Sequence, residues 1–307
     1  MKFAISILLT VISTVILIGE EKDSVPPVPT PTEANVAYGP HPENVLDFWK
    51  AEGDGPRPLH VYIHGGGWRA GSKKVAPGYL DRYLEAGVSC ASVEYRLTPD
   101  NPLPAPVHDA ARAIQFIRTK AAEWNIDPEQ IVLTGGSAGA CTSMWLLMHD
   151  DLADPESEDP VLRESTRVSA GAVWAGQTSI DPKQIVPWIG PNGIEHPMIA
   201  NAVGEKSIET ALENYDQHQA LYREFSSFNH VSEGDPPLYM RYKVDMELPS
   251  RDAGHGIHHP VFGVKMKEKC DELGVDCHLL VPGTDYQSEF KTEAEFLLDF
   301  LGVANGD

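Results

Sequence analysis

The sequence GGSAG, from Gly135 to Gly139, places a serine where it could act as a nucleophile. It matches the pattern G-x-S-x-G and stands between the apolar segments QIVLT and CTSMWLLM, which predict a strand and a helix. Glycines on both sides permit a strained turn that lifts the hydroxyl of Ser137 above the end of the strand. The free N–H groups at the start of the helix point to the same place. This arrangement suits covalent acyl transfer, although such turns also bind nucleotides or serve packing alone.

A second glycine-rich segment, HGGGW from His64 to Trp68, ends an earlier apolar strand. Three successive glycines allow the backbone to approach a ligand and to present N–H donors to a developing oxyanion. A tight turn with positive φ is the alternative, but a turn alone does not require three glycines. We expect His64 to orient this loop and not to act as a base. An oxyanion loop followed two strands later by a nucleophile is the order that an acyl-transfer site requires.

These two segments, with YRLTPDNPLPAPVHDAARAIQFI between them, resemble the α/β-hydrolase fold in its hormone-sensitive-lipase-like and feruloyl esterase-like carboxylesterase branch. The resemblance covers roughly residues 59–301 and is most specific over 61–140. It implies that Ser137 is the nucleophile. It also implies an oxyanion hole made by the backbone N–H groups of Gly66, Gly67 and Ala138. The catalytic acid is expected just after the next-to-last strand, where Asp245 stands in LYMRYKVD; a solvated carboxylate in a turn is the alternative.

The position of the catalytic base departs from this family pattern. A histidine is expected a few residues after LLVPG, and this chain has Thr284, Asp285 and Tyr286 there. A tyrosine with a reference pKa of about 10 is a poor base at neutral pH, whereas an imidazole near ~6.5 suits both halves of acyl transfer. No histidine follows His278 in the sequence. The usual base is therefore missing from its usual place.

The segment DAGHGIHHP offers a substitute, because it carries His255, His258 and His259 directly before a predicted helix. In this fold that helix begins at the carboxyl edge of the sheet, on the same face as Ser137. His258 and His259 are favoured as the base because they lie nearest the helix start, and the sequence does not separate them. Asp245 would then orient the imidazole and stabilise its charged form. Helix capping or packing under an inserted cap is the alternative role for these histidines.

Metal and cofactor chemistry is not expected. Three histidines within five residues could gather a transition metal, but no carboxylate or cysteine stands at clear ligand spacing beside them. The acidic segment DDLADPESEDP lacks the regular spacing of calcium ligands and is expected to be a solvated loop. The chemistry that Ser137 predicts needs no cofactor.

Strands alternate with helices along most of the chain, and the strands are nearly continuous apolar runs. This pattern predicts an α/β fold with a mostly parallel central sheet, helices on both faces and an opening antiparallel hairpin. The alternation is interrupted at about residues 180–235, where only two short helical patterns appear, and we expect an inserted cap there. We divide the chain into a signal peptide or anchor at 1–19, a proline-rich tether at 20–34 and one hydrolase domain at 35–303.

The N-terminus indicates export. Lys2 precedes an apolar run from Phe3 to Ile18, which is typical of a secretory signal and short for a membrane span. No clear cleavage triplet follows, so an uncleaved anchor is the alternative; we expect a secreted or periplasmic protein that meets a membrane only if the leader is retained. In an oxidising compartment Cys270 and Cys277, which flank a predicted helix-to-strand connection, could pair.

The sequence thus predicts an exported serine hydrolase that cleaves carboxylic esters through an acyl-enzyme. Its substrate would be a small-molecule ester or, as the resemblance implies, an acyl group on a polysaccharide. Nucleic acid is not expected as a partner, because the formal net charge of −21 would repel a phosphate backbone. Two alternatives stay open: a non-catalytic relative that kept the pocket for binding, and a peptidase of the same fold.

Overall fold

The centre of the molecule is an eight-stranded sheet in the order β1-β2-β4-β3-β5-β6-β7-β8. The computed structural model describes residues 27–303. β2 runs antiparallel to both β1 and β4, and all the other neighbours are parallel. The opening hairpin and the mostly parallel sheet predicted from the sequence are therefore confirmed. The strands are β1 (Glu33–Ala37), β2 (Val45–Trp49), β3 (Arg57–Ile63), β4 (Ser89–Val93), β5 (Ile126–Gly136), β6 (Ala170–Trp174), β7 (Leu238–Arg241) and β8 (Cys277–Leu280).

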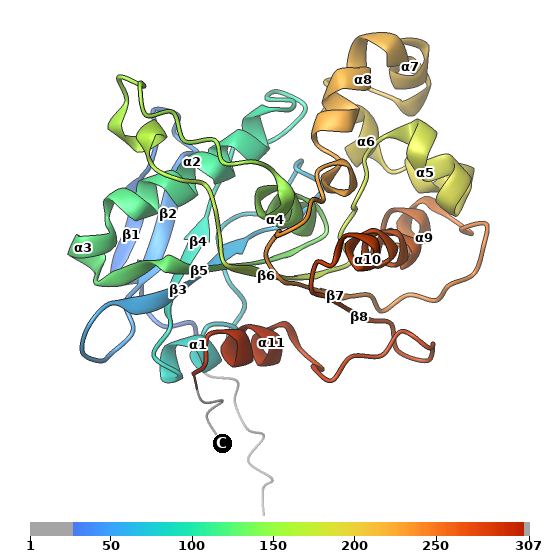
Figure 1. Ribbon diagram of the computed structural model, residues 1–307. Helices are drawn as coiled ribbons and strands as arrows, with labels where there is room; N and C mark the ends of the chain where they lie inside the picture. Colours follow the sequence, from blue (N-terminus) through green and yellow to red (C-terminus); the bar gives the residue numbers. More distant parts are fainter. Residues whose placement is uncertain (1–26, 304–307) are drawn as a thin grey trace, which may run out of the picture.

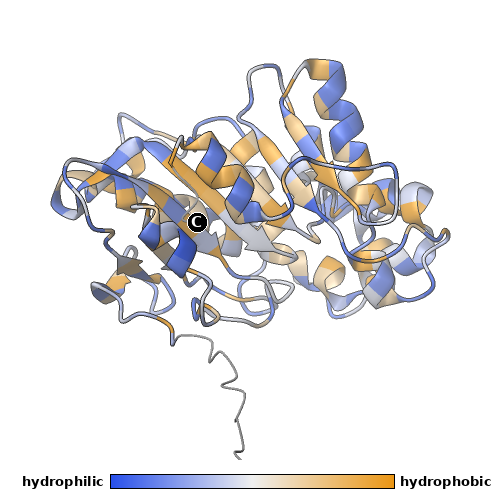
Figure 2. Cartoon of the chain, turned by 90° about the horizontal axis from the view of Figure 1, so that it is seen from below, coloured by the Kyte–Doolittle hydropathy of each residue, from blue (hydrophilic) through white to orange (hydrophobic). Residues whose placement is uncertain are grey.

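Helices cover both faces of this sheet, as Figure 1 shows. The strands between them are buried on both sides, which explains their apolar sequences. Figure 2 shows orange strands under helices whose outer sides are blue, the pattern expected for two cores separated by one sheet. One face carries α1 (Asp81–Glu85) and α11 (Glu293–Phe300), and the other carries α2 (Ala105–Thr119), α3 (Ala121–Trp124), α4 (Ala138–Met148) and α10 (Val261–Leu273).

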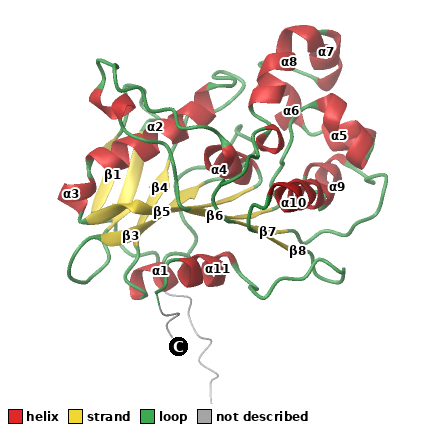
Figure 3. Ribbon diagram, in the orientation of Figure 1, coloured by secondary structure: helices red, strands yellow, loops and turns green. Residues whose placement is uncertain are grey.

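The chain leaves the sheet between β6 and β7, in the segment predicted as a cap. This cap insertion is more helical than the sequence indicated, because its helices are too short to show a long periodic pattern. Figure 3 shows these helices gathered at one end of the molecule, close to α9 (Ala253–Ile257) and α10. Met198, Tyr222 and Phe225 anchor the insertion, since their side chains are buried in the main core. The insertion contains α5 (Pro182–Ile189), α6 (Pro197–Ala202), α7 (Ile208–Glu213) and α8 (Tyr215–Glu224).

The predicted tether is ordered in its last residues. β1 begins at Glu33, the indole N–H of Trp49 donates to the carbonyl of Pro29 at 2.8 Å, and the amide of Lys50 donates to the hydroxyl of Thr32 at 2.9 Å. The predicted leader at 1–19 lies outside the described residues. Over residues 27–303, none of the helices has the length and apolar character needed to cross a membrane.

The four cysteines are buried free thiols. Cys270 near the end of α10 and Cys277 at the start of β8 are within hydrogen-bonding reach of each other, so the predicted pair lies together without a disulfide. The hydrogen bond with Cys270 and burial raise the pKa of the Cys277 thiol well above its ordinary value, which favours the protonated form.

Candidate active site

Ser137 lies at the sharp turn between β5 and α4, with φ 54° and ψ −122°. Few residues with a side chain adopt this conformation, and a close fit around the turn maintains it. The amide of Ser137 donates to the carbonyl of Trp174 at 3.0 Å. A Cβ added to Gly139 would collide with the backbone of β3 at Ile63, and one added to Gly136 would collide with the indole of Trp174. Gly136 and Gly139, on the two sides of the serine, are therefore required by their contacts, although of these two only Gly139 is a glycine of the G-x-S-x-G pattern itself.

The HGGGW loop lies directly against this turn. A Cβ added to Gly65 would stand 2.5 Å from the carbonyl oxygen of Gly136 and 3.5 Å from Cβ of Ser137. Gly66 and Gly67 have φ values of 107° and 65°, a region that favours glycine. The structure thus brings the loop of the predicted oxyanion donors to the nucleophile.

The third predicted oxyanion donor, Ala138, is the first residue of α4, where an N–H has no partner within the helix. It follows the nucleophile directly, as the resemblance implies. The role of its N–H and of the two loop N–H groups in holding an oxyanion stays a prediction.

His64 holds the loop in place, as expected from the sequence. Its Nε2 lies 2.9 Å from Oε1 of Glu94, and its ring stacks on Tyr95 with centroids 4.1 Å apart. The hydroxyl of Tyr95 also donates to the carbonyl of His64 at 2.7 Å. These contacts fix the start of the loop and leave His64 buried away from the role of base.

His258 lies beside the nucleophile: its Nε2 is 3.0 Å from Oγ of Ser137. His258 follows directly after the short helix α9, in the segment proposed to replace the missing histidine. A ring nitrogen at this distance can accept the serine proton during attack on a carbonyl carbon. The structure therefore separates the two histidines that the sequence left equal.

His259 does not reach the nucleophile in this way. It is fully buried, its Nε2 lies 3.0 Å from the carbonyl of Glu247, and its Nδ1 accepts from the amide of Val261 at 3.2 Å. The prediction of His259 as an alternative base is corrected to the packing and capping role, because its ring nitrogens are used by the backbone of Glu247, in the loop after β7, and of Val261, at the start of α10.

Asp245 is also placed differently from the prediction. Nη1 of Arg251 donates to both of its carboxylate oxygens, at 2.8 and 3.0 Å, and Nε2 of His255 lies 3.3 Å from Oδ1. The carboxylate is 55% exposed, and the Arg251 guanidinium holds the pKa of Asp245 below its usual range. Within the described residues these partners replace the predicted contact with His258, because the loop after β7 carries Asp245 outward to Arg251.

The backbone takes the place of the expected acid. The backbone of Gly254 raises the pKa of His258 and so favours a proton on its ring. Because Nε2 faces the serine, the neutral ring with its proton on Nδ1 is the tautomer whose Nε2 can accept the hydroxyl proton. A neutral carbonyl stabilises an imidazolium less than a carboxylate would. The polar core of the site is thus a Ser137–His258 pair oriented by the main chain.

A pocket of about 330 Å³ opens beside this pair. Trp174 forms one wall, with the ring of Tyr62 parallel to its indole at a centroid distance of 6.4 Å. Arg241 is held in a two-point ion pair with Glu293, at 2.8 and 2.9 Å, so its position is fixed. The pocket is lined by Ser137, Trp174, Ala175, Arg241, Lys243, Val244 and His258.

His196 is a site residue that the sequence reasoning missed. Its Nδ1 accepts from the amide of Met198 at 3.2 Å and caps α6, and its Cε1 would stand 3.4 Å from a Cβ on Gly67. Burial lowers the pKa of His196, and the positive charges of His258 and Arg69 lower it further. His196 therefore borders the oxyanion loop, and the charge of the base influences its pKa. In the sequence, only the dipeptide His-Pro indicated that His196 could cap a helix. Nothing in the sequence indicated that His196 lies beside the HGGGW loop.

We expect the acid limb of the pH profile of kcat/KM to lie below pH 6.5. Burial lowers the pKa of His258 from its ordinary value of 6.5, and the hydrogen bond to Gly254 offsets part of this effect. His258 acts as a base only when neutral, so activity should rise with pH through this lowered pKa and level off above it. Values of kcat/KM for p-nitrophenyl acetate across the acid range give the pH at which activity is half its maximum. A half-maximum above pH 6.5 would contradict the assignment of His258 as the base.

The chain is similar to known esterases in sequence. The sequence profile of the BD-FAE family matches residues 46–246. Esterase LipQ of Mycobacterium tuberculosis is 27% identical over 228 residues, which are 71% of this chain and 50% of LipQ. The probable isoprenylcysteine alpha-carbonyl methylesterase ICMEL1 of Oryza sativa subsp. japonica is 32% identical over 126 residues, 41% of this chain and 30% of that protein. The chain thus spans about half the length, or less, of the curated relatives that it matches.

Solved structures share its fold. A truncated form of a carbohydrate esterase from gut microbiota has a TM-score of 0.68 at 21% identity, over 88% of this chain and 94% of that one. The butyrate-bound esterase Est2 of the Planctomycetes species Thermogutta terrifontis has a TM-score of 0.60 at 20% identity, over 85% and 91%. At these identities the likeness concerns the fold alone, and it confirms the architecture predicted from the sequence.

Proposed function

Since the chain belongs to the BD-FAE family of α/β-hydrolases, we propose that it is a serine hydrolase that cleaves carboxylic esters through an acyl-enzyme. The observation that carries this proposal is the distance of 3.0 Å between Oγ of Ser137 and Nε2 of His258 at a strained strand-to-helix turn. A pocket retained only for binding has no need of an imidazole at the hydroxyl, so this contact favours catalysis over the non-catalytic alternative.

In the proposed reaction Oγ of Ser137 attacks the ester carbonyl carbon while Nε2 of His258 takes the hydroxyl proton. The carbonyl oxygen becomes an oxyanion, and the N–H groups of Gly66, Gly67 and Ala138 stabilise its charge. Collapse of this intermediate breaks the bond to the alcohol, which leaves with the proton from His258. A water molecule then attacks the carbonyl carbon of the acyl-enzyme and gives a proton to His258. Collapse of this second intermediate breaks the bond to Oγ of Ser137, which takes the proton back from His258, and the carboxylic acid leaves.

The pocket supports a short acyl group. Its volume of about 330 Å³ is near the lower end of the range for ligand pockets, about 300–1,000 Å³. The indole of Trp174 offers a flat wall to an apolar acyl chain or to the face of a sugar ring. The carbohydrate esterases among the structural neighbours support the finer proposal that the acyl group is carried by a saccharide.

We also propose that the enzyme acts outside the cytoplasm. Support comes from the sequence of the leader, in which Lys2 precedes an apolar run ending at Ile18. Fractionation of cells that express the full chain, followed by N-terminal sequencing of the product, tests this; recovery of an uncleaved chain from the cytosol would overturn it.

Hydrolysis of p-nitrophenyl esters of increasing acyl length tests the proposed function. We expect kcat/KM to be highest for acetate to butyrate and to fall by about tenfold or more at decanoate, because each methylene that finds no room loses its burial energy. The variant Ser137→Ala is the control for background hydrolysis. If no ester is cleaved and no fluorophosphonate labels Ser137, the protein is a binding relative; selective cleavage of peptides would indicate the peptidase.

A further inference from the structure

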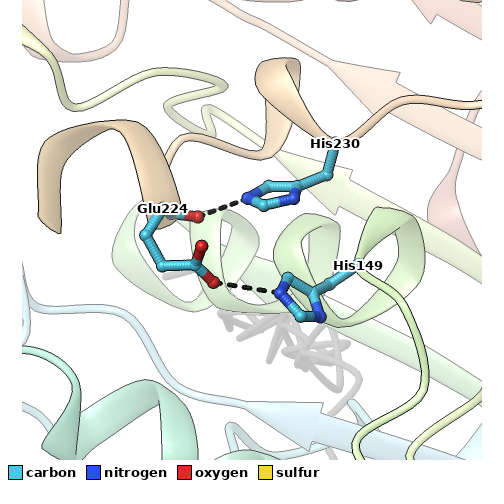
Figure 4. A group of neighbouring side chains, drawn as sticks. All are labelled: His149, Glu224 and His230. Atoms are coloured by element: carbon cyan, nitrogen blue, oxygen red, sulfur yellow. Dashed lines mark hydrogen bonds and ion pairs between the residues drawn. The ribbon is translucent and has the colours of Figure 1, made fainter. Parts of the chain in front are cut away.

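A second cluster of chemically active side chains lies apart from Ser137, on the other end of α4. It consists of His149 after α4, Glu224 at the end of α8 and His230 after the 3-10 helix Ser227–Asn229. Figure 4 shows the two imidazole rings beside Glu224, with the ring of His149 facing its carboxylate and the ring of His230 facing its main-chain oxygen. One ligand atom of each residue lies within 4.8 Å of the other two. Two imidazoles and one carboxylate form a donor set that zinc enzymes use.

Both ring nitrogens of His149 face oxygen atoms, an arrangement that a cation at this cluster would satisfy. Its Nδ1 lies 2.8 Å from the carbonyl of Asp150, and its Nε2 lies 3.0 Å from Oε1 of Glu224. Both of these oxygens are acceptors only, and a neutral imidazole has a single N–H. One nitrogen of the His149 ring therefore has no hydrogen to donate, and its lone pair would face a lone pair of the oxygen. A proton or a metal ion between the two atoms removes this repulsion. A main-chain carbonyl on the other nitrogen is also the usual second partner of a metal-bound imidazole.

His230 is oriented in a compatible way. Its Nε2 donates to the carbonyl of Glu224 at 2.5 Å, and the same oxygen accepts from the indole N–H of Trp145 at 2.9 Å. With its proton on Nε2, the ring keeps a lone pair on Nδ1 for a metal. The ring of Trp145 also packs on His149 at a centroid distance of 4.2 Å and meets the ring of His230 edge-on at 6.4 Å, so the same indole contacts both imidazoles.

The cluster is open to an ion from one side. A hollow of about 570 Å³ over α8 is lined by Glu224 and His230, together with Asp216 and Arg223. This hollow leaves space for a water molecule, which would be the fourth ligand of an ion bound by the three side chains. The carboxylate of Glu224 is 42% exposed and can move. Tetrahedral zinc needs its ligand atoms about 3.3–3.5 Å apart, so rotations of the side chains would complete the site.

We propose that His149, Glu224 and His230 bind a divalent transition-metal ion, with Zn²⁺ as the preferred ion. Because His149 ends the helix that begins at the nucleophile and the other two ligands belong to the cap insertion, the ion fixes the insertion on α4. Its role is structural, and the site takes no part in the proposed ester cleavage.

Titration of untagged, EDTA-treated protein with ZnCl₂ by isothermal calorimetry, with the thermal midpoint as a parallel measurement, tests the site. We expect one ion per chain and a rise in Tm of several degrees, since only the folded state has the site. His149→Ala, His230→Ala and Glu224→Gln should each weaken binding by about a hundredfold or more. Substitution by Co²⁺ should give the visible absorption of a tetrahedral centre.

His218→Ala is the matched control. His218 lies on α8, the helix that ends at Glu224, and its Nε2 pairs with Glu205 at 2.9 Å. Within the described part of the chain no third His, Cys, Asp or Glu completes a metal-binding group with these two residues. This variant should bind Zn²⁺ as the wild type does. No Zn²⁺ binding by the wild type, or equal losses in His218→Ala and His230→Ala with far-UV circular dichroism unchanged, would overturn the proposal. These measurements do not depend on esterase activity. The metal site can therefore be confirmed or rejected whether or not the proposed function is correct.

Discussion

Replacement of His258 by alanine is expected to lower kcat/KM for short p-nitrophenyl esters by about 10³-fold or more. The imidazole is the group within hydrogen-bonding distance of Oγ of Ser137, and without it the hydroxyl keeps its proton during attack. The loss should appear mainly in kcat, because the small ring contributes little to substrate binding. Steady-state rates with p-nitrophenyl acetate measure this change.

Asp245→Asn is the matched control for the base. Its carboxylate is bound by Arg251 and His255, so the variant should keep kcat within about threefold of the wild type. A catalytic acid at this position would instead make the variant lose about 10⁴-fold, as removal of the triad carboxylate does in serine proteases. A full loss in Asp245→Asn, or a His258→Ala variant with near wild-type rates, would contradict the assignment.

Gly65→Ala is expected to lower kcat by about 10²-fold. The added Cβ would lie 2.5 Å from the carbonyl oxygen of Gly136, and neither backbone can yield cheaply, so the loop must move away from the nucleophile. A displacement of about 1 Å of the oxyanion donors is enough for a loss of this size. Rates should be measured alongside Tm, so that a loss of fold is separated from a loss of catalysis.

Gly234→Ala serves as the control for a general effect of glycine replacement. Gly234 has φ 87° and open space around it, so the variant should lose about 1–2 kcal/mol of stability and no activity. If Gly65→Ala folds and keeps the kcat of the wild type, the HGGGW loop does not hold the oxyanion.

The sheet and the nucleophile could be predicted because local rules determine them. Strands buried on both faces have continuous apolar sequences, and the turn at Ser137 leaves room only for glycine at Gly135, Gly136 and Gly139. The same applies to the HGGGW loop, where Gly66 and Gly67 have φ values that glycine favours. Such constraints act over a few residues and can be recognised without the rest of the fold.

The partners of the base could not be predicted from spacing. His258 and His259 are neighbours in sequence, and the end of α9 directs one to Ser137 and the other to the backbone of Glu247 and Val261. Asp245 stands where a catalytic acid is expected after its strand, but Arg251, which follows in the same loop, draws it outward. These outcomes depend on the path of an irregular loop, which no periodic pattern encodes.

The cap insertion shows the same limit. Its helices have 6 to 10 residues, so they present too few turns for a periodic pattern, and single side chains such as Asp181 and Ser207 cap them. His149, Glu224 and His230 belong to segments that meet only when the insertion folds onto α4, and the sequence accordingly predicted no metal site.

The rate at which a fluorophosphonate labels Ser137, followed by mass spectrometry of the wild type and of His258→Ala, tests most directly whether the relocated imidazole activates the serine. The account predicts rapid, stoichiometric labelling of the peptide that contains Ser137 in the wild type, and labelling about 10³-fold slower in the variant. Equal labelling rates in the two proteins would show that His258 does not activate the nucleophile.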